Sequence, residues 1–299
     1  MPRLNPEPNK MNIQITEAPR TAQQVGILIF TFPPDFSLAA RAVNGVCMNW
    51  HRTGMEKTPK FFWCIHKKHT QDAKKFISEH WTKTVPSGTP TPELIEHEFD
   101  AGGHLQCLSA CGGMKWVFWH LFHDKEKSYG IDAVIKMDSD VILLRPEQWI
   151  APWAINRADY VYIPQAPCEQ FKDEKNPLAT DGSEPAVCTH LGCGWAYLVS
   201  RHAAGVIGNF PADKFKQIVF RNYGAEDRVF GRVLQESVGV ITAEISPKNV
   251  IGKSFESEPD AWTAIILDNP KDNYGKVRYS WNLSEFFTEK ESCPDTLKQ

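Results

Sequence analysis

The sequence predicts an α/β protein built on a mostly parallel sheet that is covered by helices on both faces. Short apolar runs of strand length occur at 25–30, 61–65 and 131–137, as expected for strands buried on both faces. Segments in which apolar residues recur with helical spacing lie between them, at 38–50 and 105–122. Strands that alternate with helices in this way are typical of a parallel sheet with a helical layer on either side.

The first half of the chain follows this alternation closely. The strand at 25–30 is interrupted by Pro33-Pro34-Asp35 before the helix at 38–50 begins. The segment 85–92 is rich in Pro, Thr, Ser and Gly, so a loop is expected there. The remaining elements are a helix that follows the basic stretch 66–75 and ends near Trp81, a more polar strand at 94–99, the helix at 105–122 despite Gly112-Gly113, and an apolar continuation at 141–144.

The second half is less regular. The expected elements are strands at 159–163 and 238–245, an apolar segment at 191–199, a short element at 215–220, a helix at 227–236 and a long polar loop at 168–185. There is no internal repeat and no low-complexity linker. We therefore expect a single domain preceded by a loose arm at 1–20, which is polar and rich in proline.

Composition excludes several classes of protein. The chain has 299 residues, of which 42% are hydrophobic and 23% charged, and its formal net charge is −3. These are ordinary values for a globular protein, and they imply no general affinity for phosphate backbones. No apolar run is long enough to cross a bilayer, and the start of the chain lacks the pattern of a signal peptide. A soluble, cytoplasmic protein is expected.

The cysteines give no metal site of a common kind. There are 8, scattered along a large chain, so reduced thiols are expected rather than disulfides. Cys107 and Cys111 lie four residues apart in an expected helix, and Cys188, His190 and Cys193 lie close together in sequence. Neither spacing matches a common zinc pattern, so buried structural thiols are the preferred interpretation.

The triplet Asp138-Ser139-Asp140 is the strongest functional signal. It follows an apolar strand directly, and Lys136 lies just before it. In open parallel sheets, ligands bind beyond the carboxyl ends of the strands. Two carboxylates at such a place suit a hard divalent cation, Mn²⁺ or Mg²⁺, which would neutralise a diphosphate leaving group. The simpler alternative is a plain turn between two strands.

The pair Glu226-Asp227 is the second signal, near the start of an expected helix. Acids in a first helical turn can serve only the helix dipole. The functional interpretation is that Asp227 accepts a proton from an acceptor hydroxyl while Glu226 orients the acceptor or faces inward.

The third signal is Gly192 and Gly194, followed by Trp195. Glycines here would let a bulky ligand approach the backbone closely, and the indole would offer a flat face to a sugar ring. The alternative is a core tryptophan beside a bulge.

These motifs together resemble the GT-A-fold glycosyltransferases, most closely the β-1,3-galactosyltransferase and fringe group (glycosyltransferase family 31). The resemblance rests on Lys115 and Trp119 in a helix, then on Lys136 to Asp140, and then on a glycine segment after a cysteine, here Cys188 and 192–194, and finally on Glu226-Asp227. It covers roughly 25–234 and implies a Rossmann-like three-layer fold with a mostly parallel central sheet.

The resemblance also implies roles. Residues 21–140 would form the nucleotide-sugar-binding half, ending in the D-x-D motif, and residues 141–299 the acceptor-binding half. Asp140 would bind manganese, Asp138 would contact the ribose or a metal-bound water, and Asp227 would be the base of an inverting hexosyl transfer from a UDP-sugar or other nucleotide-sugar. The further residues expected at the donor are Ser139, and Thr31, Phe32 and His66 near the nucleotide base, with Lys115 and Lys136 contacting the donor or a carboxylate.

Several alternatives stay open. Many GT-A enzymes take a third metal ligand from a late histidine, but no histidine follows His202 here. That ligand is absent, or an acid such as Asp260 or Asp268, or water.

The acceptor is a glycan or another hydroxyl compound, with a modified nucleic-acid base also open. The rival functions are a nucleotidyltransferase of GT-A-like fold, which would want a glycine-rich basic loop after the first strand, and a non-catalytic carbohydrate-binding protein.

Overall fold

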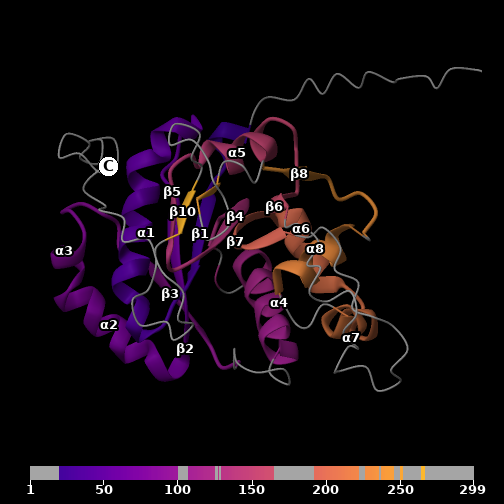
Figure 1. Ribbon diagram of the computed structural model, residues 1–299, viewed down its shortest axis with the longest axis horizontal. Coiled ribbons are helices and arrows are strands. Elements are labelled where there is room, and N and C mark those ends of the chain that lie inside the picture. The colour runs from indigo at the N-terminus through magenta and orange to yellow at the C-terminus, as the bar shows by residue number, and fades with distance from the viewer. Residues whose placement is uncertain are drawn as a thin grey trace, which may run out of the picture.

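A seven-stranded sheet forms the centre of the protein and lies between two layers of helices (Figure 1). This confirms the predicted α/β architecture with a covered sheet. The computed structural model describes residues 20–99, 107–124, 127, 129–164, 192–221, 226–235, 237–245, 250–251 and 264–266.

The elements of the described residues have the following bounds. The strands are β1 Val25–Phe30, β2 Lys60–His66, β3 Glu93–His97, β4 Ala133–Asp138, β5 Val141–Leu143, β6 Tyr160–Pro164, β7 Gly192–Ser200, β8 Thr242–Glu244, β9 Val250–Ile251 and β10 Ala264–Ile266. The helices are α1 Phe36–Asn49, α2 Thr70–Glu79, α3 Trp81–Thr84, α4 Cys107–His123, α5 Glu147–Ala154, α6 Arg201–Asn209, α7 Ala212–Arg221 and α8 Glu226–Gln235. Short 3-10 turns occur at Arg20–Ala22, Pro33–Asp35, Trp50–Thr53 and Lys67–His69.

The central sheet is mostly parallel. Its strand order is β3-β2-β1-β4-β7-β6-β8, and β7 is antiparallel to both of its neighbours. In the register of the sheet, Phe30 lies beside Cys64 on one side and Asp138 on the other, and His66 lies beside His97. The carboxyl ends of β1, β2, β3 and β4 therefore meet at one rim of the sheet.

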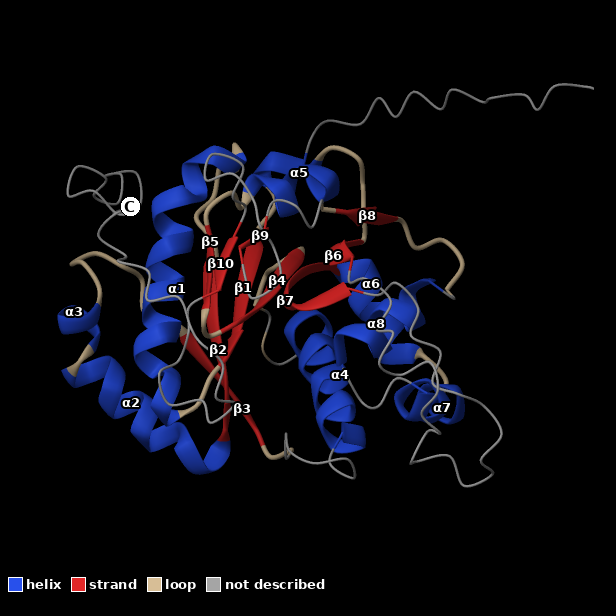
Figure 2. Ribbon diagram, in the orientation of Figure 1, coloured by secondary structure: helices blue, strands red, loops and turns tan. Residues whose placement is uncertain are grey.

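Each face of the sheet is covered by its own helices. The layer of α1, α2, α3 and α5 packs on the face that carries Ile27 and Trp63, and the layer of α4, α6, α7 and α8 packs on the face that carries Leu28 and Phe62 (Figure 2). Because side chains alternate along a strand, Lys136 and Asp138 project toward the second layer with Val134. The site described below is formed on that side.

Several boundaries differ from the sequence prediction. The segment 215–220 is part of the ten-residue helix α7, and within 238–245 only Thr242–Glu244 is a strand. The helices α5 and α6 were not predicted; α5 contains Pro152 and α6 contains two glycines, which are residues of low helix propensity.

Some predictions concern residues that are not described. The arm up to residue 19, the loop 168–185, the residues Cys188 and His190, and the alternative ligands Asp260 and Asp268 lie outside the described ranges. Within them, Cys47, Cys64 and Cys111 are buried and reduced, as expected. None of the described helices combines the length and the apolar character that a membrane crossing requires.

Candidate active site

The acidic triplet lies at the rim of the sheet, in the turn between β4 and β5. Asp138 ends β4, and its side chain is 41% exposed. Ser139 is buried and Asp140 is half-buried. Burial, together with the nearby negative charge of Asp138, raises the pKa of Asp140 to about 7. The two carboxylates therefore lie close enough to repel one another, which is a situation that a bound cation relieves.

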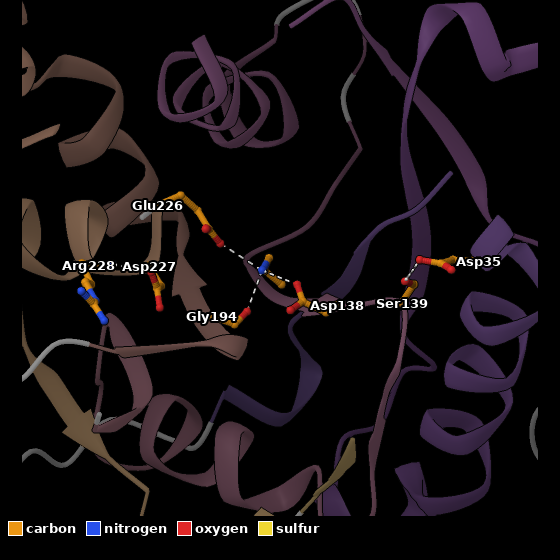
Figure 3. Close-up of polar contacts among 8 residues, drawn as sticks. Asp35, Asp138, Ser139, Gly194, Glu226, Asp227 and Arg228 are labelled. Carbon is orange, nitrogen blue, oxygen red and sulfur yellow. Dashed lines mark hydrogen bonds and ion pairs between the residues drawn. The ribbon is translucent and has the colours of Figure 1, made fainter. Parts of the chain in front are cut away.

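The sequence interpretation missed a third acid beside this turn. Asp35 precedes α1 and is buried. Its Oδ2 accepts a hydrogen bond of 3.2 Å from the hydroxyl of Ser139 (Figure 3). The bond joins the loop after β1 to the middle of the triplet and limits how far the turn can move. The only sequence signal was an acid shortly after the end of a buried strand.

Lys136 is a buried lysine in the middle of the rim. Only 3% of the residue is exposed, and its Nζ donates to Oδ1 of Asp138 at 2.7 Å and to the carbonyl oxygen of Gly194 at 2.6 Å. An ion pair of 3.0 Å joins the same Nζ to Oε1 of Glu226. Burial alone would lower the pKa of Lys136, but the charges of Asp138 and Glu226 outweigh it and raise the pKa well above its usual range. Of the two roles considered for this lysine, the structure shows the contact with a carboxylate.

Asp227 lies in the first turn of α8 and is 9% exposed. Its Oδ1 accepts a hydrogen bond of 2.9 Å from the backbone N–H of Arg228. Burial raises the pKa of Asp227 to about 7, and the adjacent charge of Glu226 adds to this effect. A carboxylate that gains its proton near neutral pH is suited to general-base catalysis.

Gly194 brings β7 close to α8. A Cβ atom at this position would lie 3.3 Å from Oδ2 of Asp227, so the group that approaches the glycine backbone is a carboxylate of the protein itself. Trp195 is half-buried and packs against the core under α1 and α5. Gly192 lies at the first position of β7, beside Pro164. Substrate contacts by Gly192, Gly194 and Trp195 stay predictions.

Of the other predicted donor residues, Thr31 and Phe32 follow β1 and His66 ends the neighbouring strand β2, whereas Lys115 lies on α4. Thr31 is buried, and its hydroxyl has no hydrogen-bond partner among the described residues. Phe32 is 50% exposed, and the His66 ring lies edge-on to His97, with ring centroids 5.5 Å apart. Lys115 donates from Nζ to the carbonyl oxygen of Phe210 at 2.9 Å, next to the ring of Phe215. This contact joins α4 to the segment before α7.

A cavity that was not predicted opens beyond the end of β3. Its volume is 380 Å³, within the usual range of small-molecule pockets. Its walls include Phe99, which stacks on His97 with a centroid distance of 3.8 Å, and the half-exposed ring of Trp116 from α4. Burial, with the nearby His66, lowers the pKa of His97 to about 4, so the ring is neutral at pH 7. The remaining lining residues are Lys67, Glu96, Glu98 and Gly113.

Comparison with known proteins bears on the fold. A crystal structure of the galactosyltransferase LgtC in complex with donor and acceptor sugar analogues matches with a TM-score of 0.50 at 11% identity, over 87% of this chain and 93% of that chain. The fold is that of the GT-A glycosyltransferases. The apo form of mouse xyloside xylosyltransferase 1 gives a TM-score of 0.47 at 10% identity, over 82% of this chain and 97% of that chain.

Sequence comparison adds no closer relative, since no protein-family model and no curated protein matches the chain. The GT-A fold agrees with the resemblance drawn from the motifs. Membership of the β-1,3-galactosyltransferase and fringe group stays a prediction.

Proposed function

We propose that this protein is a metal-dependent glycosyltransferase that moves a sugar from a UDP-sugar or another nucleotide-sugar to a hydroxyl acceptor with inversion. The observation that carries the proposal is the arrangement of acids at one rim of a GT-A fold. Asp138 ends β4 and Asp140 follows it, and Asp227, with a pKa of about 7, lies across Gly194 from the end of that strand.

The residues at the rim fit a hard divalent cation such as Mn²⁺ or Mg²⁺. Among the described residues, no group of three or more His, Cys, Asp or Glu is placed to hold a metal ion. Two carboxylates are nevertheless enough for a cation that takes its other ligands from phosphate oxygens and water. Asp138 and Asp140 would hold this ion, which would supply charge neutralisation for the departing diphosphate.

The proposed transfer uses Asp227 as the base. The oxygen of the acceptor hydroxyl forms a bond to the anomeric carbon as the bond between that carbon and the diphosphate oxygen breaks. The hydroxyl proton passes to the carboxylate of Asp227, and the nucleoside diphosphate leaves with the bonding electrons. Asp227 must be ionised to accept the proton, so the pKa of about 7 places its working range above neutral pH.

The cavity beyond β3 is a candidate binding site for the nucleoside base. Three strand spacings separate β4 from β3, about 14 Å in total, which is comparable with the length of an extended nucleoside diphosphate. Phe30, His66 and His97 lie along this path on the α4 side of the sheet. We propose that the base lies against Trp116 and Phe99, farther along the rim than the Thr31 and Phe32 positions considered from the sequence.

Replacement of the indole tests this placement. We expect Trp116→Ala to weaken UDP binding about tenfold, because stacking of one base on an aromatic ring contributes about 1–3 kcal/mol. The measurement is calorimetric titration of UDP in the presence of Mn²⁺. Trp119→Ala is the matched control, because Trp119 lies on the same helix, is 39% exposed and stacks on His123 away from the cavity. An equal loss of UDP affinity in Trp116→Ala and Trp119→Ala would contradict the placement of the base against Trp116.

The proposed function itself is tested by donor turnover. The purified protein is incubated with UDP- and GDP-sugars, with and without Mn²⁺, and release of the free nucleotide is measured. Cleavage that requires both a nucleotide-sugar and the cation supports the proposal. Binding of free sugars without any nucleotide cleavage would favour a carbohydrate-binding protein instead. Salt-sensitive binding of an oligonucleotide acceptor would favour the nucleic-acid alternative.

A further inference from the structure

Burying the charged side chain of Lys136 at this position costs free energy of folding. It occupies an inward-facing place on a central strand where neighbouring residues are apolar, and its side chain is 4% exposed. Burying an ammonium group costs several kcal/mol unless its partners compensate. An apolar residue of similar volume would stabilise the strand at least as well, so stability alone does not explain the lysine.

The partners of Lys136 come from three separate elements. Asp138 belongs to β4, Gly194 to β7 and Glu226 to the first turn of α8. In Figure 3 the dashed lines from these three residues meet at one ammonium group. The next residue after Glu226 is Asp227, the base of the proposed reaction. One buried charge thus connects the acid that faces the donor to the helix turn that carries the base.

Resting on the proposed function, we infer that Lys136 is a positioning residue: its ammonium group holds Asp138 and Glu226 together and thereby fixes Asp227 against the end of β4. Neither Lys136 nor Glu226 needs to touch the substrate in this role.

The charges around Asp227 predict the direction in which each substitution shifts the pKa of this carboxyl group. From its own helix Glu226 disfavours and Arg228 favours the ionised carboxylate, and from β4 Lys136 favours it. The phenol of Tyr197 on β7 also interacts electrostatically with Asp227. Removing the positive charge of Lys136 should therefore raise the pKa of Asp227, whereas removing the negative charge of Glu226 should lower it.

The test is the titration of Asp227 in the apo protein, followed by carbon-detected NMR of ¹³C-labelled aspartate. The Asp227 signal is assigned as the one that is lost in Asp227→Asn. We expect Glu226→Gln to move the midpoint to lower pH by about half a pH unit or more, and Lys136→Met to move it to higher pH. Lys60→Met is the matched control, because Lys60 lies at the far end of β2 and donates to the carbonyl oxygen of Tyr129. It should leave the midpoint unchanged.

The outcomes separate this inference from the proposed function. The positioning role would be overturned if the titration midpoint of Asp227 stayed unchanged in Glu226→Gln and Lys136→Met, or shifted in the same direction in both. This holds even if sugar transfer occurs. If Lys136→Met fails to fold, Glu226→Gln decides the question alone, because it replaces the carboxylate with a side chain of the same size. A failure of donor turnover in the wild-type protein would overturn the proposed function without affecting the titration.

Discussion

Asp140→Ala is expected to abolish the contribution of Mn²⁺ to nucleotide binding. In the wild-type protein, UDP should bind about a hundredfold more tightly with Mn²⁺ than with a chelator present, because the cation joins the rim carboxylates to the diphosphate. In the variant the two affinities should be equal within a few-fold. Calorimetric titration of UDP, with Mn²⁺ and then with EDTA, measures both values.

The pH dependence of the same binding has a defined direction. The raised pKa of about 7 means that Asp140 is mostly protonated below neutral pH. Protons then compete with the cation, so the Mn²⁺-dependent part of the affinity should fall as the pH is lowered from 8 toward 6. Asp72→Ala, which removes an exposed carboxylate on α2, is the control. A variant at Asp140 that still gains affinity from Mn²⁺ would show that the cation binds elsewhere.

The strands that end at the rim could be predicted from sequence because their signals are local. The apolar run before Asp138 and the acids after it are neighbours in the chain, and the carboxyl end of a buried strand has a known relation to ligand sites. The same local pattern predicted the strand before Thr31 and the one before His66. The rim and the acids Asp138 and Asp140 were therefore predictable from sequence, whereas Asp35 was missed.

The network around Lys136 could not be predicted, because its members are far apart in the chain. Positions 136, 194 and 226 meet only because β7 lies antiparallel beside β4 and α8 packs across both. The cavity beyond β3 was missed for a related reason. Its aromatic wall joins Phe99, which follows a polar edge strand, to Trp116 on α4, and only folding brings these two residues together.

The helix α6, which was not predicted, shows how tertiary packing can place a glycine inside a helix. Gly208 resembles a helix breaker by propensity, but a Cβ atom there would lie 2.4 Å from Cε3 of Trp119. The glycine is thus explained by the close packing of α6 on α4. Propensity is a local quantity, and here the tertiary contact between two helices outweighs it.

We expect Asp227→Asn to lose sugar-transfer activity and to keep its affinity for the donor nucleotide. The amide has nearly the size of the carboxylate but cannot accept the acceptor proton, so the rate constant kcat should fall by about a thousandfold. The dissociation constant of UDP with Mn²⁺ should change less than threefold, about 0.6 kcal/mol, because in the proposed reaction this side chain contacts the acceptor and not the donor. Asp213→Asn, an exposed acid in the first turn of α7, controls for the loss of a helix-terminal charge.

The wild-type pH profile adds an independent check on the same residue. Since burial and Glu226 raise the pKa of Asp227 to about 7, the carboxylate is protonated and inactive as a base at lower pH. The transfer rate at saturating donor should therefore fall about tenfold for each pH unit below 7, and this limb should be absent from the residual rate of Asp227→Asn. If Asp227→Asn kept both the wild-type transfer rate and its fall below pH 7, the base would be another group. An equal loss of donor affinity would instead mean that Asp227 belongs to the donor side of the rim.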